Sequence, residues 1–247
     1  MTVPAHLEHG SARVSLPTVA LLGGSFDPIH RGHINSALEL CERLSLDELR
    51  FLPCYRPVHK TGLQASAQQR LAMVALGITD CGDSGAALRV DDRELRRAGW
   101  SYSVDTLQQL RLELGPQVAI IWVMGTDSFA GLDSWHRWTE LLSFAHIVVM
   151  TRPAAQLPDS GPVAQLMRTA RASHSQQLSE VAAGLIWFEQ LTPYAISATG
   201  IRADLAAARG VSGEITEPAL SAYPLLAEQL PGPVMDYIVA QGLYCKY

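Results

Sequence analysis

The stretch Val19-Ala-Leu-Leu-Gly-Gly-Ser-Phe-Asp-Pro-Ile-His-Arg-Gly-His33 decides the fold. It begins with four apolar residues, which two glycines follow, and it ends with two histidines three residues apart. Beyond it, apolar side chains recur at helical spacing, at Ile34, Ala37, Leu38, Cys41 and Leu44. This spacing predicts a helix that begins near residue 31 or 32. The stretch therefore indicates a strand, a tight turn and the start of a helix.

A turn of this kind can hold a chain of phosphates. Gly23 and Gly24 allow the backbone a positive φ and let a ligand approach without meeting a Cβ atom. Free N–H groups at a helix N-terminus attract anions. His30 and His33 would lie on the first turn, where imidazole N–H groups can donate to phosphate oxygens. The alternative is a glycine turn followed by two surface histidines.

These residues carry a resemblance to a known family. Residues 23–33 resemble the His-x-Gly-His signature of the nucleotidyltransferase superfamily, and the longer motif is similar to that of bacterial nicotinate-nucleotide adenylyltransferases. That family usually has threonine where this chain has Ser25, so the hydroxyl is kept. The resemblance extends from Thr18 to about Tyr244. It implies a Rossmann-like fold and transfer of AMP from ATP to nicotinate mononucleotide, which gives deamido-NAD and pyrophosphate.

Strand-like and helix-like runs alternate along the rest of the chain. We expect strands at residues 19–22, 49–53, 88–91, 118–124, 146–150 and 185–191, and helices at 34–44, 68–78, 104–114 and 135–144. Such alternation predicts right-handed βαβ units in a doubly wound, mainly parallel α/β sheet. On the helix at 68–78 we expect a buried face made of Leu71, Val74, Ala75 and Ile78. Residues 154–179 should form a surface loop and one helix outside the site.

The chain is expected to form one domain. Residues 1–17 are polar and predict a flexible N-terminal extension. Residues 18–247 would form a single nucleotidyltransferase domain, in which 197–247 is a helical C-terminal subdomain. Ligands of open α/β sheets bind beyond the carboxyl ends of the strands, so the segments that follow the strands should converge on one rim.

A second motif, Ile196-Ser-Ala-Thr-Gly-Ile-Arg202, follows the last predicted strand. Ser197 and Thr199 offer hydroxyl groups at a helix start, and Arg202 comes one turn later, which together form an anion site. The alternative is an ordinary helix cap with an exposed arginine. The motif matches Ile-Ser-x-Thr-x-Ile-Arg of the family, which binds the ATP triphosphate.

The resemblance implies three groups of site residues. The catalytic group, which holds the ATP phosphates and the departing pyrophosphate, is His30, His33 and Arg202. The nucleotide-binding group is Gly23, Gly24, Ser25, Phe26, Gly125, Asp127, Arg152, Ser197, Ala198 and Thr199. The mononucleotide-binding group is His59, Lys60, Tyr102, Ser103 and Trp135.

Several of these residues have a plainer explanation beside the functional one. His59 and Lys60 resemble the family segment Pro-Pro-His-Lys, but they also fit a solvated basic loop. Ser103 ends a segment similar to one that contacts the nicotinate group, and a serine there also caps a helix well. Asp127 can receive ribose hydroxyls or cap the next helix. Trp135 can stack on the pyridine ring, which leaves Trp138 as the tryptophan expected in the core.

Composition narrows the class of protein. The 247 residues are 48% hydrophobic and 17% charged, as in ordinary soluble globular proteins. The formal net charge of -5 argues against a general nucleic-acid binder. Four scattered cysteines fit reduced thiols better than a disulfide framework or a zinc site. No segment approaches the ~20 apolar residues of a membrane span, and residues 1–17 lack the apolar run of a signal peptide, so we expect a cytoplasmic protein.

The expected partners are small molecules, ATP and nicotinate mononucleotide, with no nucleic acid and no membrane; a homo-oligomer is left open. Mg²⁺ should bridge phosphate oxygens with few or no direct protein ligands. One alternative is another adenylyl- or cytidylyltransferase, such as one that uses phosphopantetheine. Another is a nucleotide-binding regulator without turnover. A class I aminoacyl-tRNA synthetase has a similar motif, but this chain is too short and too acidic for tRNA.

Overall fold

A computed structural model describes residues 15–57, 62–79, 81, 87–97, 99–151, 156–208 and 223–244. Within them six parallel strands form one sheet in the order β3-β2-β1-β4-β5-β6. The strands are β1 (Thr18–Gly24), β2 (Glu48–Pro53), β3 (Ala87–Val90), β4 (Ala119–Gly125), β5 (His146–Thr151) and β6 (Ile186–Gln190). The strand order reverses between β1 and β4, so the chain winds outward from the middle of the sheet in both directions. The predicted doubly wound α/β fold is confirmed.

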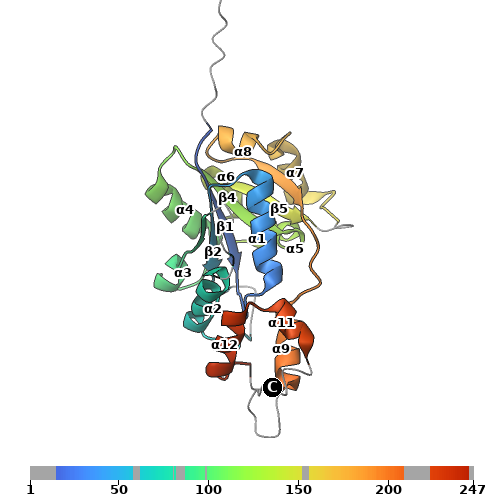
Figure 1. The fold of residues 1–247 in the computed structure, drawn as a ribbon. Helices are drawn as coiled ribbons and strands as arrows, with labels where there is room; N and C mark the ends of the chain where they lie inside the picture. Colours follow the sequence, from blue (N-terminus) through green and yellow to red (C-terminus); the bar gives the residue numbers. More distant parts are fainter. Residues whose placement is uncertain are drawn as a thin grey trace, which may run out of the picture.

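Helices cover both faces of the sheet (Figure 1). On one face an apolar cluster joins β1, β2, β4 and β5 to α1 (Arg31–Leu44), α2 (Ala67–Thr79), α8 (Gln177–Glu180), α9 (Ala198–Ala207), α11 (Pro224–Gln229) and α12 (Gly232–Ala240). On the other face a second cluster joins the same strands to α4 (Ser103–Leu114), α5 (Thr126–Ala130), α6 (Leu141–Phe144) and α7 (Gly161–Ala170). A short helix, α3 (Arg93–Arg96), follows β3.

Two predicted segments differ from the structure. Residues 135–144 were expected to form one helix, which is wrong: there are 3₁₀ turns η1 (Leu132–Ser134) and η2 (Trp138–Glu140), and then the short helix α6. The break lies at Arg137, whose φ of 51° is left-handed and cannot continue a right-handed helix. In 154–179 two helices, α7 and α8, replace the single helix that was expected.

The buried face of α2 also differs from the prediction. Its buried residues are Arg70, Met73, Val74 and Gly77, whereas Ala75 is exposed and Leu71 half-buried. Helical periodicity alone could not find this face, because it includes a charged side chain and a glycine. Gly77 lies there because a Cβ atom would stand 3.3 Å from Ile29 and 3.4 Å from Ile34, so α2 packs closely on α1 and the loop before it.

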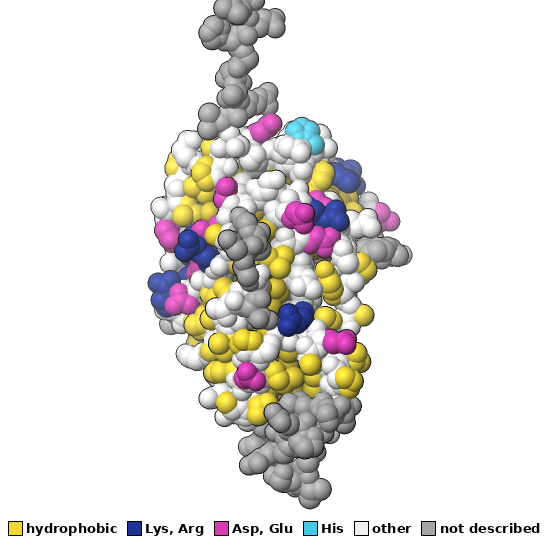
Figure 2. Space-filling view, in the orientation of Figure 1, with side chains coloured by type: hydrophobic (Ala, Val, Ile, Leu, Met, Phe, Trp, Pro, Cys, Tyr) yellow, Lys and Arg dark blue, Asp and Glu magenta, His cyan; other side chains and the backbone are white. Residues whose placement is uncertain are grey.

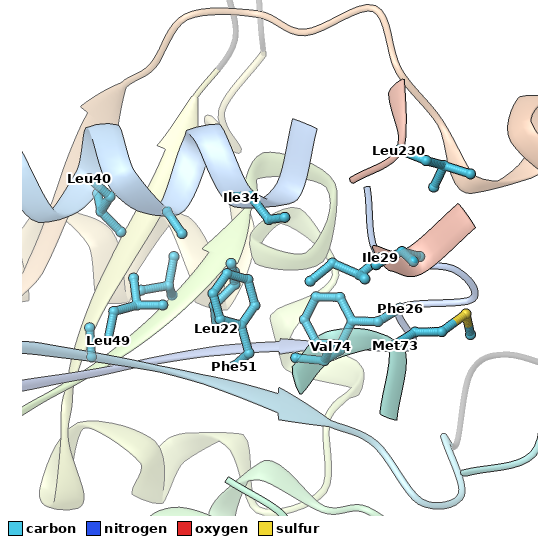
Figure 3. Close-up of a cluster of buried hydrophobic side chains, with 14 of the residues drawn as sticks. Leu22, Phe26, Ile29, Ile34, Leu40, Leu49, Phe51, Met73, Val74 and Leu230 are labelled. Carbon is cyan, nitrogen blue, oxygen red and sulfur yellow. The ribbon is translucent and has the colours of Figure 1, made fainter. Parts of the chain in front are cut away.

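The loop between β1 and α1 is anchored in the core (Figure 3). Phe26 and Ile29 are 2% and 0% exposed, although they belong to a connecting loop. Phe26 packs edge-on against Phe51 of β2, with 5.7 Å between the ring centroids. Burying one such side chain contributes roughly 1.5–3 kcal/mol, so these two residues hold the loop firmly to the sheet.

The C-terminal helices α9, α11 and α12 lie at the end of the sheet where the strands terminate (Figure 1). Apolar side chains gather on the surface in this lower part of the molecule, whereas charges of both signs are interspersed above it (Figure 2). Leu225 and Val239, on α11 and α12, are among the exposed large hydrophobic residues. Across the described ranges, no helix has the length and apolar character to pass through a membrane.

His146, at the start of β5, should make the fold sensitive to acid. It is fully buried, its Nε2 lies 2.8 Å from the Val181 carbonyl oxygen, and its Nδ1 accepts from the Leu185 N–H at 3.1 Å. Burial lowers the pKa of His146, so the unfolded chain binds the proton more tightly. The stabilisation is complete above the unfolded pKa of about 6.5 and is lost as the pH falls below it.

We expect His146→Gln, which does not titrate, to reduce the loss of unfolding free energy between about pH 7 and about pH 5, by up to about 1.4 kcal/mol per pH unit. Urea denaturation at several pH values measures this slope. His174, which is exposed, provides the matched control His174→Gln. An unchanged slope in His146→Gln would contradict the prediction.

Candidate active site

Two adjoining hollows lie at the carboxyl ends of the strands. Their volumes are about 690 Å³ and about 740 Å³. Both are bordered by Leu22, Ser25, Phe26, His33, Gly125 and Met150. The ends of β1, β4 and β5 therefore form a wall that the two hollows share, and the predicted convergence on one rim is observed for these segments.

The first hollow brings together the two sequence motifs. His30 and His33 line it, and so does Arg202, which lies far away in the sequence. The other predicted nucleotide-binding residues that border it are Ser25, Phe26, Gly125, Asp127, Ser197, Ala198 and Thr199. The N-termini of α1 and α9 thus face one cavity, which is the arrangement that an extended anion needs.

His30 is the N-cap of α1 and is 6% exposed. Burial lowers its pKa to about 4, so the imidazole is neutral near pH 7. Its Nδ1 is buried and has no hydrogen-bond partner among the described residues. His30 can therefore offer an N–H group to a phosphate, but it brings no positive charge.

His33 lies one turn further along α1. Its ring stacks on that of His30 with 3.6 Å between centroids, and the ring of Phe26 meets it edge-on at 5.2 Å. Its Nδ1 accepts from the His30 backbone N–H at 3.3 Å, so Nε2 is the atom that carries the hydrogen of the neutral ring. These contacts hold the His33 ring against the wall that both hollows share.

The start of α9 forms as the sequence predicts. Ser197 is the N-cap, and its hydroxyl accepts from the Gly200 N–H at 3.0 Å. The Arg202 guanidinium donates to the Asp27 carbonyl at 2.7 Å and to the Thr199 hydroxyl at 3.3 Å. Because arginine has five N–H donors, these two bonds orient the group and leave donors for a ligand.

The positive φ that was expected at the glycines of the first motif is not found there. Neither Gly23 nor Gly24 has a positive φ; in this loop Phe26 does, at 47°. A Cβ atom on Gly24 would stand 2.8 Å from the Phe26 ring, and one on Gly23 would stand 3.3 Å from the Trp122 ring. The glycines thus make room for aromatic side chains, and they border the second hollow but not the first.

The second hollow contains three of the predicted mononucleotide-binding residues, Tyr102, Ser103 and Trp135. The prediction that Ser103 caps α4 is wrong, because Tyr102 is the N-cap and no side chain caps the helix. Trp135 and Trp138 are both half-buried and both pack against the same core. Of these two, Trp135 borders the hollow and Trp138 does not.

One wall of the second hollow is built from two loops. The Ser101 hydroxyl accepts from the backbone N–H groups of Tyr55 at 3.0 Å and Arg56 at 3.3 Å. The Arg56 guanidinium also lies over the Trp100 ring, 5.2 Å from its centroid. The loop after β2 is in this way fastened to the segment before α4, so a ligand would meet a preformed wall.

The remaining predicted residues have different fates. Asp127 is exposed in the first turn of α5, and Gly125 is the N-cap, so Asp127 does not cap the helix. His59, Lys60 and Arg152 lie outside the described residues. Within the described part of the chain, no group of three His, Cys, Asp or Glu side chains could hold a metal ion.

Comparisons with known proteins agree with this geometry. The family model described as cytidylyltransferase-like matches residues 21–204. A Cellvibrio japonicus protein named "Probable nicotinate-nucleotide adenylyltransferase" is 47% identical over 191 residues, which cover 75% of this chain and 86% of that protein. A protein of the same name from Pseudomonas entomophila is 42% identical over 95% of this chain and 98% of its own length. This chain belongs to the nicotinate-nucleotide adenylyltransferase family.

Solved structures of a nicotinic acid mononucleotide adenylyltransferase share the fold. The nicotinic acid mononucleotide adenylyltransferase of Plasmodium falciparum, complexed with NaAD, aligns with a TM-score of 0.65 at 16% identity and covers 92% of this chain and 97% of that one. The same protein complexed with APC aligns with a TM-score of 0.63. At this low identity the likeness shows the Rossmann-like fold of the family.

In this member of the family, sequence reasoning missed several residues that build the site. Trp122, Glu94 and His136 border the second hollow; burial raises the pKa of the Glu94 carboxyl, which accepts from the Thr106 hydroxyl at 2.9 Å. Arg70 is 1% exposed and donates to the carbonyls of Ser25 at 2.7 Å and Cys54 at 2.6 Å, so it joins the loops after β1 and β2. Its only signal was a charged residue in step with the apolar Met73, Val74 and Gly77.

Proposed function

We propose that this chain transfers AMP from ATP to nicotinate mononucleotide and releases pyrophosphate. The observation that carries the proposal is that two adjoining hollows share His33, so two ligands can meet beside one imidazole. The first hollow, with two helix N-termini and Arg202, suits a triphosphate. The second, with Trp135 and Tyr102, suits an aromatic ring.

The reaction we propose is a direct, in-line displacement. An oxygen of the mononucleotide phosphate forms a bond to the α-phosphorus of ATP, and the bond from that phosphorus to the bridging oxygen breaks. The electron pair leaves with pyrophosphate. The attacking phosphate is already an anion at neutral pH, so no general base and no covalent intermediate are needed. Catalysis then depends on positioning and on stabilising charge in the transition state.

The site residues divide this work by their position. His30 and His33, at the N-terminus of α1, would hold the ATP phosphates through N–H donors. Arg202, which Asp27 and Thr199 orient, would bind the departing pyrophosphate together with Ser197 and Thr199. Gly125 and Asp127 would contact the nucleoside. Trp135 would stack on the pyridine ring, a contact worth ~1–3 kcal/mol for a base on an aromatic side chain.

For residues outside the described ranges, the resemblance alone supports a role. His59 and Lys60 would contact the mononucleotide, and Arg152 would lie near the nucleotide. Gly23 and Gly24, which are among the described residues, would contribute indirectly. A Cβ at Gly23 would crowd the Trp122 ring and a Cβ at Gly24 would crowd the Phe26 ring, and both rings lie beside the second hollow.

The first hollow suits Mg²⁺ that arrives bound to the ATP phosphates. Its hydrogen-bond donors are imidazoles, hydroxyls and a guanidinium, which bind phosphate oxygens. The Asp27 carboxylate already accepts three hydrogen bonds within the protein. When bound to ATP, Mg²⁺ would neutralise phosphate charge and keep several waters, while Arg202 and the histidines hold the remaining oxygens.

The test supplies ATP and Mg²⁺ with each of three acceptors: nicotinate mononucleotide, nicotinamide mononucleotide and phosphopantetheine. We expect pyrophosphate and deamido-NAD with nicotinate mononucleotide, because the second hollow offers ring-stacking side chains. Product with phosphopantetheine alone would place the chain with another transferase. ATP binding without pyrophosphate from any acceptor would indicate a nucleotide-binding regulator.

A further inference from the structure

Asp27 lies inside the loop that carries the two histidines, and it is 2% exposed. Its carboxylate accepts from the backbone N–H groups of Gln64 at 2.9 Å and Ala65 at 3.1 Å. A third hydrogen bond comes from the hydroxyl of Tyr244, 2.8 Å from Oδ1. Two segments distant in the sequence, the one before α2 and the one after α12, therefore meet at one buried carboxylate.

The hydroxyl of Tyr244 is buried and remains a hydrogen-bond donor. It is 4% exposed and has a left-handed φ of 61°, and the preceding Leu243 N–H donates to the Ile238 carbonyl of α12 at 3.0 Å. Burial and the Asp27 charge raise the pKa of Tyr244, so the hydroxyl keeps its proton throughout the physiological range. A protonated hydroxyl facing a buried carboxylate makes a charge-assisted hydrogen bond.

The same aspartate also holds the arginine of the first hollow. Its carboxylate accepts a hydrogen bond from the Tyr244 hydroxyl, and its backbone carbonyl accepts one from the Arg202 guanidinium at 2.7 Å. Asp27 precedes His30 by three residues, so the position of its peptide affects both the loop and the guanidinium. The arrangement forms a continuous path from the Tyr244 hydroxyl through Asp27 to Arg202.

We propose that Tyr244 is a positioning residue for the triphosphate end of the site. Its hydroxyl fixes Asp27, and the Asp27 carbonyl in turn fixes the Arg202 guanidinium in the first hollow. The inference rests on the proposed function only in naming ATP as the ligand of that hollow. Tyr244 does not border either hollow, so it acts through Asp27 and Arg202.

The test is Tyr244→Phe, which removes one oxygen atom and keeps the ring. We expect the Kd for ATP, measured by calorimetry, to rise about tenfold, as for a lost hydrogen bond to a charged group. In steady-state kinetics kcat/KM for ATP should fall about tenfold, while the KM for nicotinate mononucleotide stays within twofold, because Arg202 does not border the second hollow. A general loss of structure would instead weaken the binding of both substrates to a similar extent.

Two controls sharpen the result. Tyr237→Phe makes the same chemical change at a half-buried tyrosine of α12 that borders neither hollow, and it should leave both constants unchanged. In an Arg202→Lys background, Tyr244→Phe should have less effect than in the natural sequence, because the two residues act along one path.

The outcomes separate this inference from the proposed function. Failure of the natural protein to form deamido-NAD would contradict the proposed function. The role of Tyr244 is decided separately, by the ratio of the Kd for ATP in Tyr244→Phe to that in the natural protein. Unchanged ATP affinity in Tyr244→Phe, an equal change for both substrates, or full additivity with Arg202→Lys would overturn the inference. Unfolding of Tyr244→Phe would overturn it too, since the hydroxyl would then serve the fold.

Discussion

Replacing His33 by alanine is expected to lower kcat by about 10²–10³-fold, as for the loss of one preorganised donor to a transition-state oxyanion. His33 lies at the N-terminal turn of α1 and is the imidazole that borders both hollows. Its Nδ1 accepts from the His30 backbone N–H, so Nε2–H is the donor that the proposed mechanism assigns to a phosphate oxygen. Single-turnover measurements with saturating ATP and nicotinate mononucleotide would report the chemical step.

The matched control is His174→Ala, at an exposed position that borders neither hollow. It should retain full turnover. Because the His33 ring packs on Phe26 and His30, the variant's unfolding free energy must be measured beside its kinetics. A folded His33→Ala protein with near-natural turnover would remove the proposed mechanism.

A second large effect is expected at Arg111, on stability and not on catalysis. Its guanidinium donates to the carbonyls of Gly115 and Val118, each at 2.7 Å, and to those of Phe144 and Ala182, each at 2.8 Å. Val118 precedes β4, Phe144 precedes β5, and Ala182 precedes β6. One half-buried arginine thus holds the amino ends of three strands together.

We expect Arg111→Met to lower the free energy of unfolding by about 2–4 kcal/mol, since several carbonyls lose their donor and water can restore only part of the bonding. These carbonyls lie at the amino ends of the strands, whereas the hollows lie at the carboxyl ends, so kcat should not change. Arg168→Met removes an exposed arginine with one long contact, 3.4 Å from the Asp159 carbonyl, and should cost little. A loss below about 0.5 kcal/mol in Arg111→Met would contradict this account.

The sequence was most informative where one physical signal dominated. All six strands lie within two residues of their expected bounds, and the signal was clearest for β4, because a buried parallel strand is apolar on both faces. The convergence of His30, His33 and Arg202 followed from strand direction alone, since parallel strands place their carboxyl ends on one edge. Both motifs lie where a strand ends and a helix begins, and this made their position predictable.

Other features depend on contacts that no local pattern records. Tyr244 and Asp27 lie 217 positions apart in the chain, and only the folded sheet brings the hydroxyl to the carboxylate. Arg70 lies on the buried face of α2 because its guanidinium donates there to the carbonyls of Ser25 and Cys54 and to the Cys54 sulfur. The broken helix at residues 135–144 depends on the left-handed Arg137, a conformation that its residue type does not favour.

The wall common to the two hollows has a thermodynamic consequence. A ligand in either hollow touches Ser25, Phe26 and His33, so it changes the surroundings that the second ligand meets. The binding affinities of the two substrates are then coupled, and linkage requires that each alters the affinity of the other by the same factor. We therefore expect the Kd of each substrate to change by the same factor when the other substrate is bound.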